Sequence, residues 1–199
     1  GQGRGGADLR DYDAARVTDQ SPVEGVGQHD AEAMWARLEH FLKAVVPMAE
    51  AAGVRIAVHP NDPPVPAFRG VAQPLSDMAG LRRLLATVES PYNCLFMDTG
   101  VITELGESAA AAIREFGTRI ATVHFRNVRV LEPRYRYVET FHDEGDADLL
   151  ECMRAFHEVG YEGMLDPDHT PRLSGDSHDM RQGFALAVGQ MIALRRAVT

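Results

Sequence analysis

Four residues that can bind a metal ion each follow a short apolar run, and they recur along the 199-residue chain. They are His59 after VRIAV, Asp98 after CLFM, His124 after RIATV and, after EGML, Asp166 or Asp168. Counted to Asp168, the intervals between them are 39, 26 and 44 residues. Imidazoles combined with carboxylates suit Mn²⁺, Fe²⁺, Co²⁺ or Zn²⁺, whereas Mg²⁺ prefers oxygen ligands alone. A single such residue is more often part of a turn, so the prediction of a metal site depends on all four meeting.

Two further motifs place polar groups close to these residues. His169 follows Asp168 directly, where it can transfer protons near neutral pH or simply begin a helix. In HFRNV, Arg126 lies two residues beyond His124 and therefore on the same face of a strand. It can pair with a substrate carboxylate, with Asn127 beside it, or it can be an ordinary arginine of the surface or core.

The segment RYRYVETFHDEGD, residues 134–146, is polar and aromatic. It predicts either a lid over a substrate or a long connection, and the sequence does not decide between them. As a lid it offers Tyr137 for substrate binding and His142 for proton transfer.

The surrounding pattern predicts alternating helices and strands. Residues 1–28 are rich in Gly, Asp and Arg and are expected to be loop or poorly ordered. From Asp30 an amphipathic helix is expected, and four strand–helix pairs follow it. The expected strands are VRIAVHP, CLFMDTG, RIATVHFRNV and EGMLDPDH; the helices after them are LSDMAGLRRLLATVES, ESAAAAIREFG, DADLLECMRAFHEVG and DMRQGFALAVGQMIALRRAV. Ser76 or Asp77 is expected to cap the first of these.

Short apolar strands that alternate with helices predict a parallel α/β sheet. An open doubly wound sheet would spread the strand ends along a line, whereas a barrel gathers them around one mouth. The ligand pattern therefore favours a TIM-type (β/α)₈ barrel, with roughly 31 residues per unit before insertions. Four units make half of such a barrel, so residues 29–199 are expected to be its second, C-terminal half. A missing N-terminal segment, a second polypeptide or a self-dimer would complete it.

Composition narrows the functional classes. The net charge is -9 and the pI is about 5.3, which disfavours binding to nucleic acid or anionic membranes. The two cysteines, Cys94 and Cys152, form no CxxC motif, which is typical of a reduced cytoplasmic protein. No apolar run is long enough for a transmembrane helix, and the N-terminus is not a signal peptide.

Taken in order, several motifs resemble the mannonate dehydratase family, whose members are metal-dependent lyases with a xylose-isomerase-like TIM barrel. The motifs are VRIAVHPNDPP, SPYNCLFMDTG, TVHFRNV, ETFHDEGDADLLECMRAFHEVGYEG and PDHTP. The resemblance implies dehydration of a small sugar acid, D-mannonate, to 2-keto-3-deoxygluconate with Mn²⁺ or a similar ion. It places His59, Asp98, His124 and Asp168 at the ligand positions and His169 at the catalytic histidine.

Three positions depart from the family pattern. Asp98 stands where the family usually has Cys, which moves the metal preference towards Mn²⁺ or Mg²⁺. Asp166 replaces an Arg, and Phe184 replaces a catalytic Tyr. A sugar isomerase or epimerase on the same barrel is therefore one alternative, and a metal-binding homologue with impaired catalysis is another.

Overall fold

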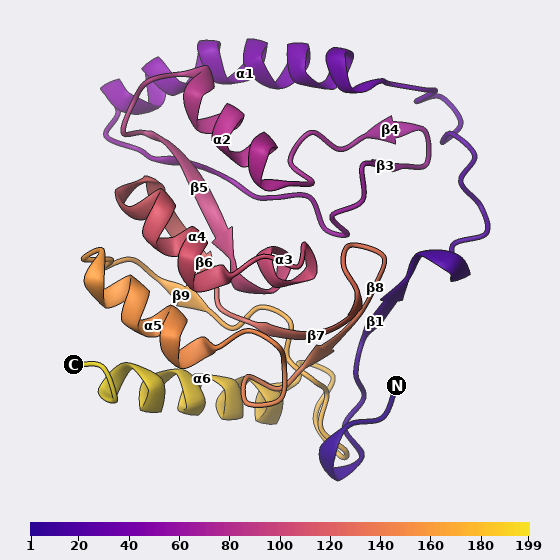
Figure 1. Ribbon diagram of the computed structural model, residues 1–199, viewed down its shortest axis with the longest axis vertical. Coiled ribbons are helices and arrows are strands. Elements are labelled where there is room, and N and C mark those ends of the chain that lie inside the picture. Colours follow the sequence, from indigo (N-terminus) through magenta and orange to yellow (C-terminus); the bar gives the residue numbers. More distant parts are fainter.

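A parallel four-stranded sheet forms the centre of the computed structural model, which describes residues 1–199 (Figure 1). Its strands run in the order β2, β5, β6, β9, and every neighbouring pair is parallel. Their bounds are β2 Ile56–Val58, β5 Asn93–Asp98, β6 Ile120–His124 and β9 Leu165–Asp166. The predicted parallel α/β arrangement is confirmed.

Helices separate the strands along the chain. They are α1 Ala31–Ala51, α2 Met78–Thr87, α3 Thr99–Glu104, α4 Ala109–Phe116, α5 Leu149–Glu158 and α6 Arg181–Arg196. The side chain of Asp77, not Ser76, caps α2 by accepting a hydrogen bond from Gly80 N. Helix α3 was not expected from the sequence, and Asp98 caps it through Val101 N. None of the helices combines the length and apolar character needed to cross a lipid bilayer.

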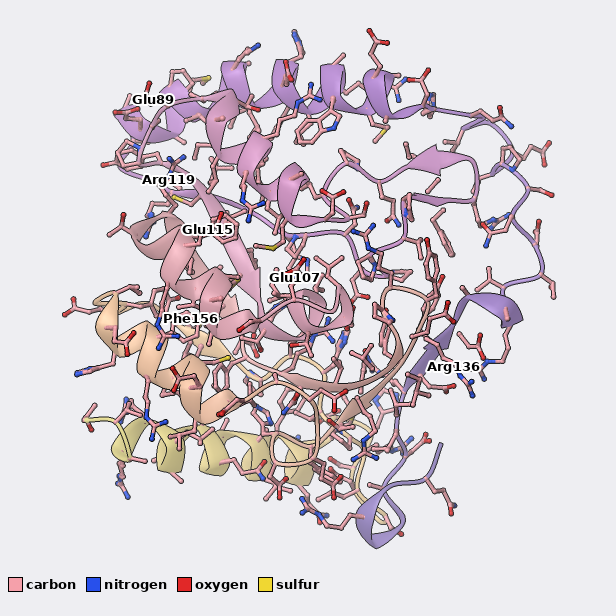
Figure 2. The ribbon with its side chains drawn as sticks, viewed as in Figure 1. Glu89, Glu107, Glu115, Arg119, Arg136 and Phe156 are labelled. Carbon is pink, nitrogen blue, oxygen red and sulfur yellow. The ribbon has the colours of Figure 1, made fainter.

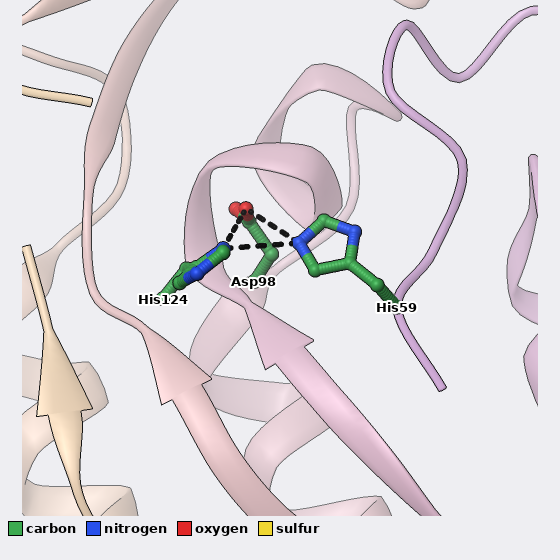
Figure 3. Close-up of side chains that lie close together, drawn as sticks. All are labelled: His59, Asp98 and His124. Carbon is green, nitrogen blue, oxygen red and sulfur yellow. Dashed lines mark hydrogen bonds and ion pairs between the residues drawn. The ribbon is translucent and has the colours of Figure 1, made fainter. Parts of the chain in front are cut away.

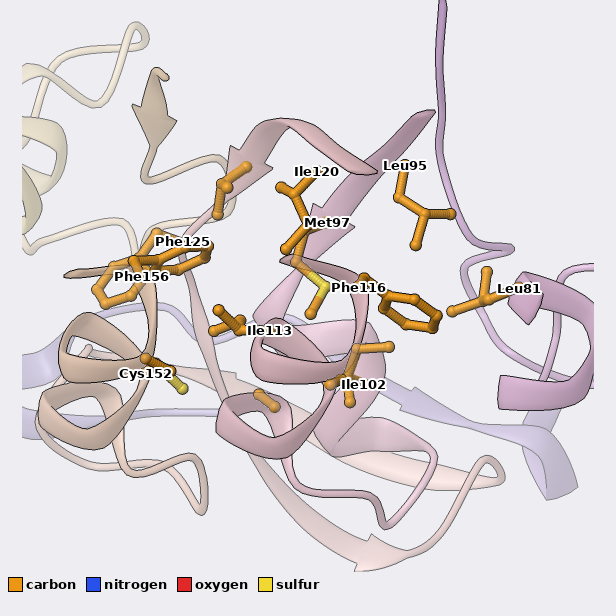
Figure 4. Close-up of a cluster of buried hydrophobic side chains, with 14 of the residues drawn as sticks. Leu81, Leu95, Met97, Ile102, Ile113, Phe116, Ile120, Phe125, Cys152 and Phe156 are labelled. Atoms are coloured by element: carbon orange, nitrogen blue, oxygen red, sulfur yellow. The ribbon is translucent and has the colours of Figure 1, made fainter. Parts of the chain in front are cut away.

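The helices pack on one face of the sheet around a cluster of 24 buried side chains (Figure 4). On this face, Leu95 and Met97 of β5 and Val123 of β6 are almost completely buried. Figure 4 shows Leu81 of α2, Phe116 of α4 and Phe156 of α5 in the same cluster. Burial of these side chains supplies the main driving force that holds the strands in register.

Alternation along the strands sends the strand-end residues to the opposite face. Val58, Met97 and Val123 pack against the helices, so the residues that follow them, His59, Asp98 and His124, point away from the core. Phe96 and His124 on that opposite face are only half buried, so this face is less covered by other parts of the protein. The fold thereby delivers three polar side chains to one place.

A second, antiparallel sheet lies beside the ends of the central strands. Its order is β1, β8, β7, with bounds β1 Asp11–Asp13, β8 Arg136–Thr140 and β7 Asn127–Glu132. Figure 2 shows Arg136 beside β1, where its Nε lies 3.6 Å from Asp13 Oδ2. A short hairpin, β3 Ala67–Phe68 and β4 Val71–Ala72, follows β2.

The second sheet contains residues for which the sequence predicted a different structure. The predicted strand RIATVHFRNV is interrupted after His124, and its last residues begin the β7–β8 hairpin. The first part of the 134–146 segment is strand β8. Residues 1–28 are mostly irregular, apart from β1 and the short 3₁₀ turns Arg4–Gly6 and Ala14–Arg16. Since β1 pairs with β8, this segment is part of the fold.

Candidate metal centre

His59, Asp98 and His124 converge at the ends of three neighbouring strands (Figure 3). His59 Nε2 lies 3.0 Å from His124 Nδ1. Asp98 Oδ2 lies 3.4 Å from His59 Nε2 and 3.5 Å from His124 Nδ1. Asp98 and His124 are direct partners in the parallel ladder, which explains their proximity. The sequence predicted this convergence from the strand ends alone.

These spacings fit a divalent cation. With metal–ligand bonds of roughly 2.1 Å, adjacent ligand atoms lie about 3.0 Å apart in octahedral and about 3.4 Å apart in tetrahedral coordination. His59 Nδ1 lies 2.7 Å from the carbonyl oxygen of Pro60, which can only accept, so Nδ1 carries the proton and Nε2 presents a lone pair to the cluster. Such a hydrogen bond on the remote nitrogen is typical of metal-binding histidines.

Asp98 remains ionised although it is fully buried. Burial acts to raise its pKa, but the charge of Arg126, the two neighbouring imidazoles and the hydrogen bond from Val101 N outweigh it. They hold the pKa of Asp98 well below its usual range. A carboxylate oxygen therefore faces the two imidazoles.

Asp168 approaches the cluster from the loop after β9. Its Oδ2 lies 3.3 Å from His124 Nδ1 and 3.7 Å from Arg126 Nε. The backbone of Asp168 is left-handed, with φ of 50°, and its N–H donates to Asp166 Oδ1 at 3.1 Å. Asp166 therefore supports the turn that presents Asp168, a role that the sequence left open.

Arg126 has no free donor group directed at solvent, because its side chain is 1% exposed and each nitrogen meets a carboxylate. Nε donates to Asp98 Oδ2 at 3.0 Å, Nη1 to Glu104 Oε1 at 2.8 Å, and Nη2 to Asp62 Oδ2 at 2.8 Å. The sequence placed Arg126 correctly beside the cluster, and its role in substrate binding stays a prediction.

The other two predicted substrate-binding residues also have protein partners. Tyr137 is buried and its hydroxyl donates to Asp62 Oδ1 at 2.8 Å. Asn127 Nδ2 donates to the carbonyl oxygens of His142 and Ala147, and its Oδ1 accepts from Val128 N and Ala147 N. Asn127 thus fixes the loop after β8. Substrate binding by these two residues stays a prediction.

The two predicted proton-transfer histidines lie in different surroundings. His169 Nε2 lies 3.6 Å from Asp168 Oδ2, and 31% of its side chain is exposed. A hydrogen bond to Glu139, opposed by burial, raises the pKa of His169. His142 is buried and donates from Nε2 to the Phe125 carbonyl at 2.7 Å. Burial lowers the pKa of His142, and no hydrogen bond or ion pair joins it to the metal centre. Its catalytic role stays a prediction.

Sequence reasoning did not select two acidic residues close to this centre, Asp62 and Glu104. Asp62 lies in the HPNDPP motif three residues after His59, so its position was a usable signal. Glu104 carries no comparable signal, because it is placed by helix α3, which the sequence pattern did not indicate.

Comparison with known proteins identifies the family. The family model described as D-mannonate dehydratase (UxuA) matches residues 9–196. The chain belongs to the D-mannonate dehydratase family. Mannonate dehydratase 1 of Halalkalibacterium halodurans is 37% identical over 141 residues, which are 69% of this chain and 38% of that protein. The chain therefore spans about two fifths of the length of this curated D-mannonate dehydratase family member.

Solved structures agree with the family assignment and the fold class. The crystal structure of mannonate dehydratase from Streptococcus suis serotype 2 has a TM-score of 0.83 and 27% identity, and the match covers 98% of this chain and 60% of that chain. A xylose isomerase domain protein from Planctomyces limnophilus has a TM-score of 0.60 at 14% identity, with 82% and 55% covered. The second likeness shows the fold alone, which is of the xylose-isomerase-like TIM-barrel type expected for the D-mannonate dehydratase family.

Proposed function

We propose that this protein takes part in the metal-dependent dehydration of a sugar acid, with D-mannonate as substrate and 2-keto-3-deoxygluconate as product. The observation that supports this proposal most directly is the convergence of His59, Asp98 and His124 in a chain of the D-mannonate dehydratase family. The isomerase or epimerase alternative has only fold-level likeness behind it.

We further propose that these three residues and Asp168 hold a divalent cation, and that Mn²⁺ is the native ion. Two imidazole nitrogens and two carboxylates suit Mn²⁺ better than Mg²⁺. When bound, the ion supplies Lewis-acid polarisation of the substrate carboxylate and 2-hydroxyl, which acidifies the C2–H bond. The role proposed for Arg126 is to orient two side chains of the protein, Asp98 and Asp62, through the hydrogen bonds that it donates to them.

Dehydration needs two proton transfers: one proton leaves C2, and one reaches the departing 3-hydroxyl to form water. His169 is proposed to perform one of them at Nε2, the ring nitrogen nearer Asp168. The geometry does not assign the group that performs the second proton transfer. His142 is the candidate from the sequence. Phe184, in the first turn of α6, cannot transfer a proton.

The four-stranded sheet is proposed to be the C-terminal half of a (β/α)₈ barrel formed by residues 29–199. Strands β2 and β9 are each paired on one side only. Large apolar side chains are exposed on the helices next to these edges: Phe41 and Met48 on α1, Val188 and Ile192 on α6. Further strand–helix units, from additional sequence or from a second chain as in a homo-oligomer, would cover both edges.

Activity with D-mannonate tests the proposal. The protein is loaded with Mn²⁺, metal content and oligomeric state are measured, and formation of a 2-keto-3-deoxy acid is followed. His169→Gln should lower kcat by about 10²–10⁴, the usual contribution of general acid–base catalysis. The matched control is His178→Gln, since the His178 side chain is fully exposed on the same loop.

The possible results distinguish an active dehydratase from a metal-binding homologue with impaired catalysis and from a protein that binds no metal ion. Product formation that requires Mn²⁺ and His169 supports the dehydratase. A metal-loaded protein that forms no product is the impaired homologue instead. Failure to bind any divalent cation contradicts the metal centre itself.

A further inference from the structure

We propose that Asp62 is a positioning residue for the candidate metal centre and that it acts through the guanidinium of Arg126. By holding one nitrogen of this group, Asp62 directs another nitrogen at Asp98 and keeps the guanidinium away from Asp168. The consequence for metal binding and catalysis rests on the proposed function. The structural part, the position of the guanidinium, is tested in the metal-free protein.

The guanidinium of Arg126 is completely buried, and each of its three nitrogens donates to an acidic side chain. Nη2 donates to Asp62, Nη1 to Glu104 and Nε to Asp98, at 2.8, 2.8 and 3.0 Å. A guanidinium is planar, and its N–H bonds point in fixed directions. Two anchored nitrogens therefore determine the direction of the third. Asp62 and Glu104 in this way aim Nε at the oxygen of Asp98 that faces both imidazoles.

The backbone of α3 leaves room for the guanidinium in this one position. A Cβ atom added to Gly100 would lie 2.6 Å from both Cζ and Nη1 of Arg126, which is closer than van der Waals contact allows. The guanidinium therefore lies directly against the backbone of α3. A side chain that fits this closely and has three acceptors is part of a built arrangement.

Asp168 is the carboxylate that a released guanidinium would reach. Of the four acidic side chains next to Arg126, Asp168 alone accepts no hydrogen bond from it, and its Oδ2 lies 3.7 Å from Nε. A buried N–H group without an acceptor is strongly unfavourable, so Arg126 without Asp62 should move towards another carboxylate. An ion pair with Asp168 would occupy one of the four proposed metal ligands.

The chain on both sides of Asp62 is fixed. The backbone N–H of Asn61 donates to Leu75 O at 3.0 Å, and Asn61 Oδ1 accepts from Leu75 N at 2.9 Å. The carbonyl oxygen of Pro63 accepts from Gln73 Nε2 at 3.0 Å. Asp62 lies between these two anchors, with 23% of its side chain exposed. Its carboxylate can therefore hold a partner in place.

The second oxygen of Asp62 connects it to the antiparallel sheet. Oδ1 accepts from the hydroxyl of Tyr137 at 2.8 Å. Tyr137 is 3% exposed and lies in β8, the middle strand, opposite Tyr12 of β1; the two ring centroids are 5.4 Å apart. Removal of the Tyr137 hydroxyl should therefore loosen the carboxylate that holds Arg126.

Three variants test the consequence for the metal: Asp62→Ala, Asp62→Asn and Tyr137→Phe. In calorimetric titration, Asp62→Ala should bind Mn²⁺ about 10–100-fold more weakly, as outer-shell substitutions at metal sites do. Asn can still accept from Arg126 but carries no charge, so Asp62→Asn should lose less affinity than Ala. Tyr137→Phe should lose affinity in the same direction. The matched controls, Asp8→Asn and Tyr135→Phe, change exposed side chains and should bind as the wild type does.

Catalysis should follow the same order. At saturating Mn²⁺ with D-mannonate, kcat should be lowest in Asp62→Ala and partly restored in Asp62→Asn. A role limited to overall stability would leave the Mn²⁺ affinity and kcat of the folded variants unchanged. This difference separates a positioning role from a purely structural one.

A spectroscopic measurement requires neither metal nor activity. In ¹⁵N NMR of the arginine-labelled, metal-free protein, the buried Nε–H of Arg126 should give a slowly exchanging signal, assigned by its nuclear Overhauser contacts to Gly100. Asp62→Ala should shift this signal and speed its exchange with water more than about tenfold, because the guanidinium is no longer held. Asp8→Asn should leave the signal unchanged.

The results distinguish failure of this proposal from failure of the proposed function. If the wild type binds Mn²⁺ but forms no product, while signal and affinity change as expected, the dehydratase assignment fails and the positioning role stands. If the wild type binds no divalent cation, the metal centre fails, and the Arg126 signal alone decides whether Asp62 holds the guanidinium. An unchanged signal, or wild-type Mn²⁺ affinity despite a shifted signal, overturns the proposal. Should Asp62→Ala not fold, Asp62→Asn and Tyr137→Phe are judged by the same criteria.

Discussion

Replacing Glu104 with Gln should leave stability nearly unchanged near pH 4.5 and make the variant progressively more stable than the wild type as the pH rises. Glu104 is fully buried, and its Oε1 accepts from Arg126 Nη1 at 2.8 Å, while its Oε2 is buried without a partner. Burial raises the pKa of Glu104 well above its usual value; attraction by Arg126 opposes this, and repulsion from Asp62 and Asp98 adds to it.

The magnitude follows from proton linkage. In the unfolded chain Glu104 ionises near pH 4.5, whereas in the folded protein it keeps its proton to a higher pH. Between these two pKa values the free energy of unfolding of the wild type falls by about 1.4 kcal/mol per pH unit, because only the unfolded state has released the proton. Gln cannot ionise, yet its amide oxygen can still accept from Arg126. The stability gap should therefore widen by roughly 1.4 kcal/mol per unit until the folded pKa is passed.

Urea unfolding with a chelator present, in half-unit steps from pH 4.5 to 8, measures this gap. Glu107→Gln is the control, since Glu107 is exposed three residues away and should give a curve parallel to the wild type. If the Glu104→Gln curve also stays parallel, Glu104 is ionised in the folded protein and pairs with Arg126 as a full charge. That result would refute the argument from burial.

Three further substitutions test the centre and the scaffold. His124→Ala removes the imidazole that lies within 3.5 Å of both Asp98 and Asp168, and should weaken Mn²⁺ binding by more than the roughly 10–100-fold typical of outer-shell changes; calorimetric titration that shows wild-type affinity would exclude His124 as a ligand. Asp77→Ala removes the cap at Gly80 N and should cost about 1 kcal/mol, whereas Asp77→Asn should restore most of it in urea unfolding. Ile113→Ala empties a fully buried position of α4 and should cost about 2–5 kcal/mol; a loss below about 1 kcal/mol would mean that the core cluster does not depend on this contact.

The sequence was sufficient to predict the parallel α/β arrangement and the convergence of His59, Asp98 and His124, because both follow from local periodicity. In each of these three segments the last core residue is followed by a polar one, so His59, Asp98 and His124 had to share the face opposite the helices. Parallel strands then place their carboxyl ends together. No knowledge of distant contacts was needed for this step.

The contacts around these residues could not be predicted in the same way. The strand that contains His124 was expected to continue through Arg126, but it ends where the chain turns into the β7–β8 hairpin. That turn directs Arg126 towards three acidic side chains, one of them on a helix that the sequence pattern did not indicate. Pairings between residues 22 to 64 positions apart have no periodic signal.

Asp98 connects the candidate metal centre to the scaffold. Its Oδ1 caps α3 through Val101 N, and its Oδ2 faces both imidazoles and accepts from Arg126 Nε. The two carboxylate oxygens divide these contacts between them, whereas a thiolate has a single sulfur atom for all of them. The carboxylate therefore does more than favour a harder cation, because it also couples the position of α3, and with it Glu104, to the metal centre. A change of ligand type at this position would alter the buried charge network together with the metal preference.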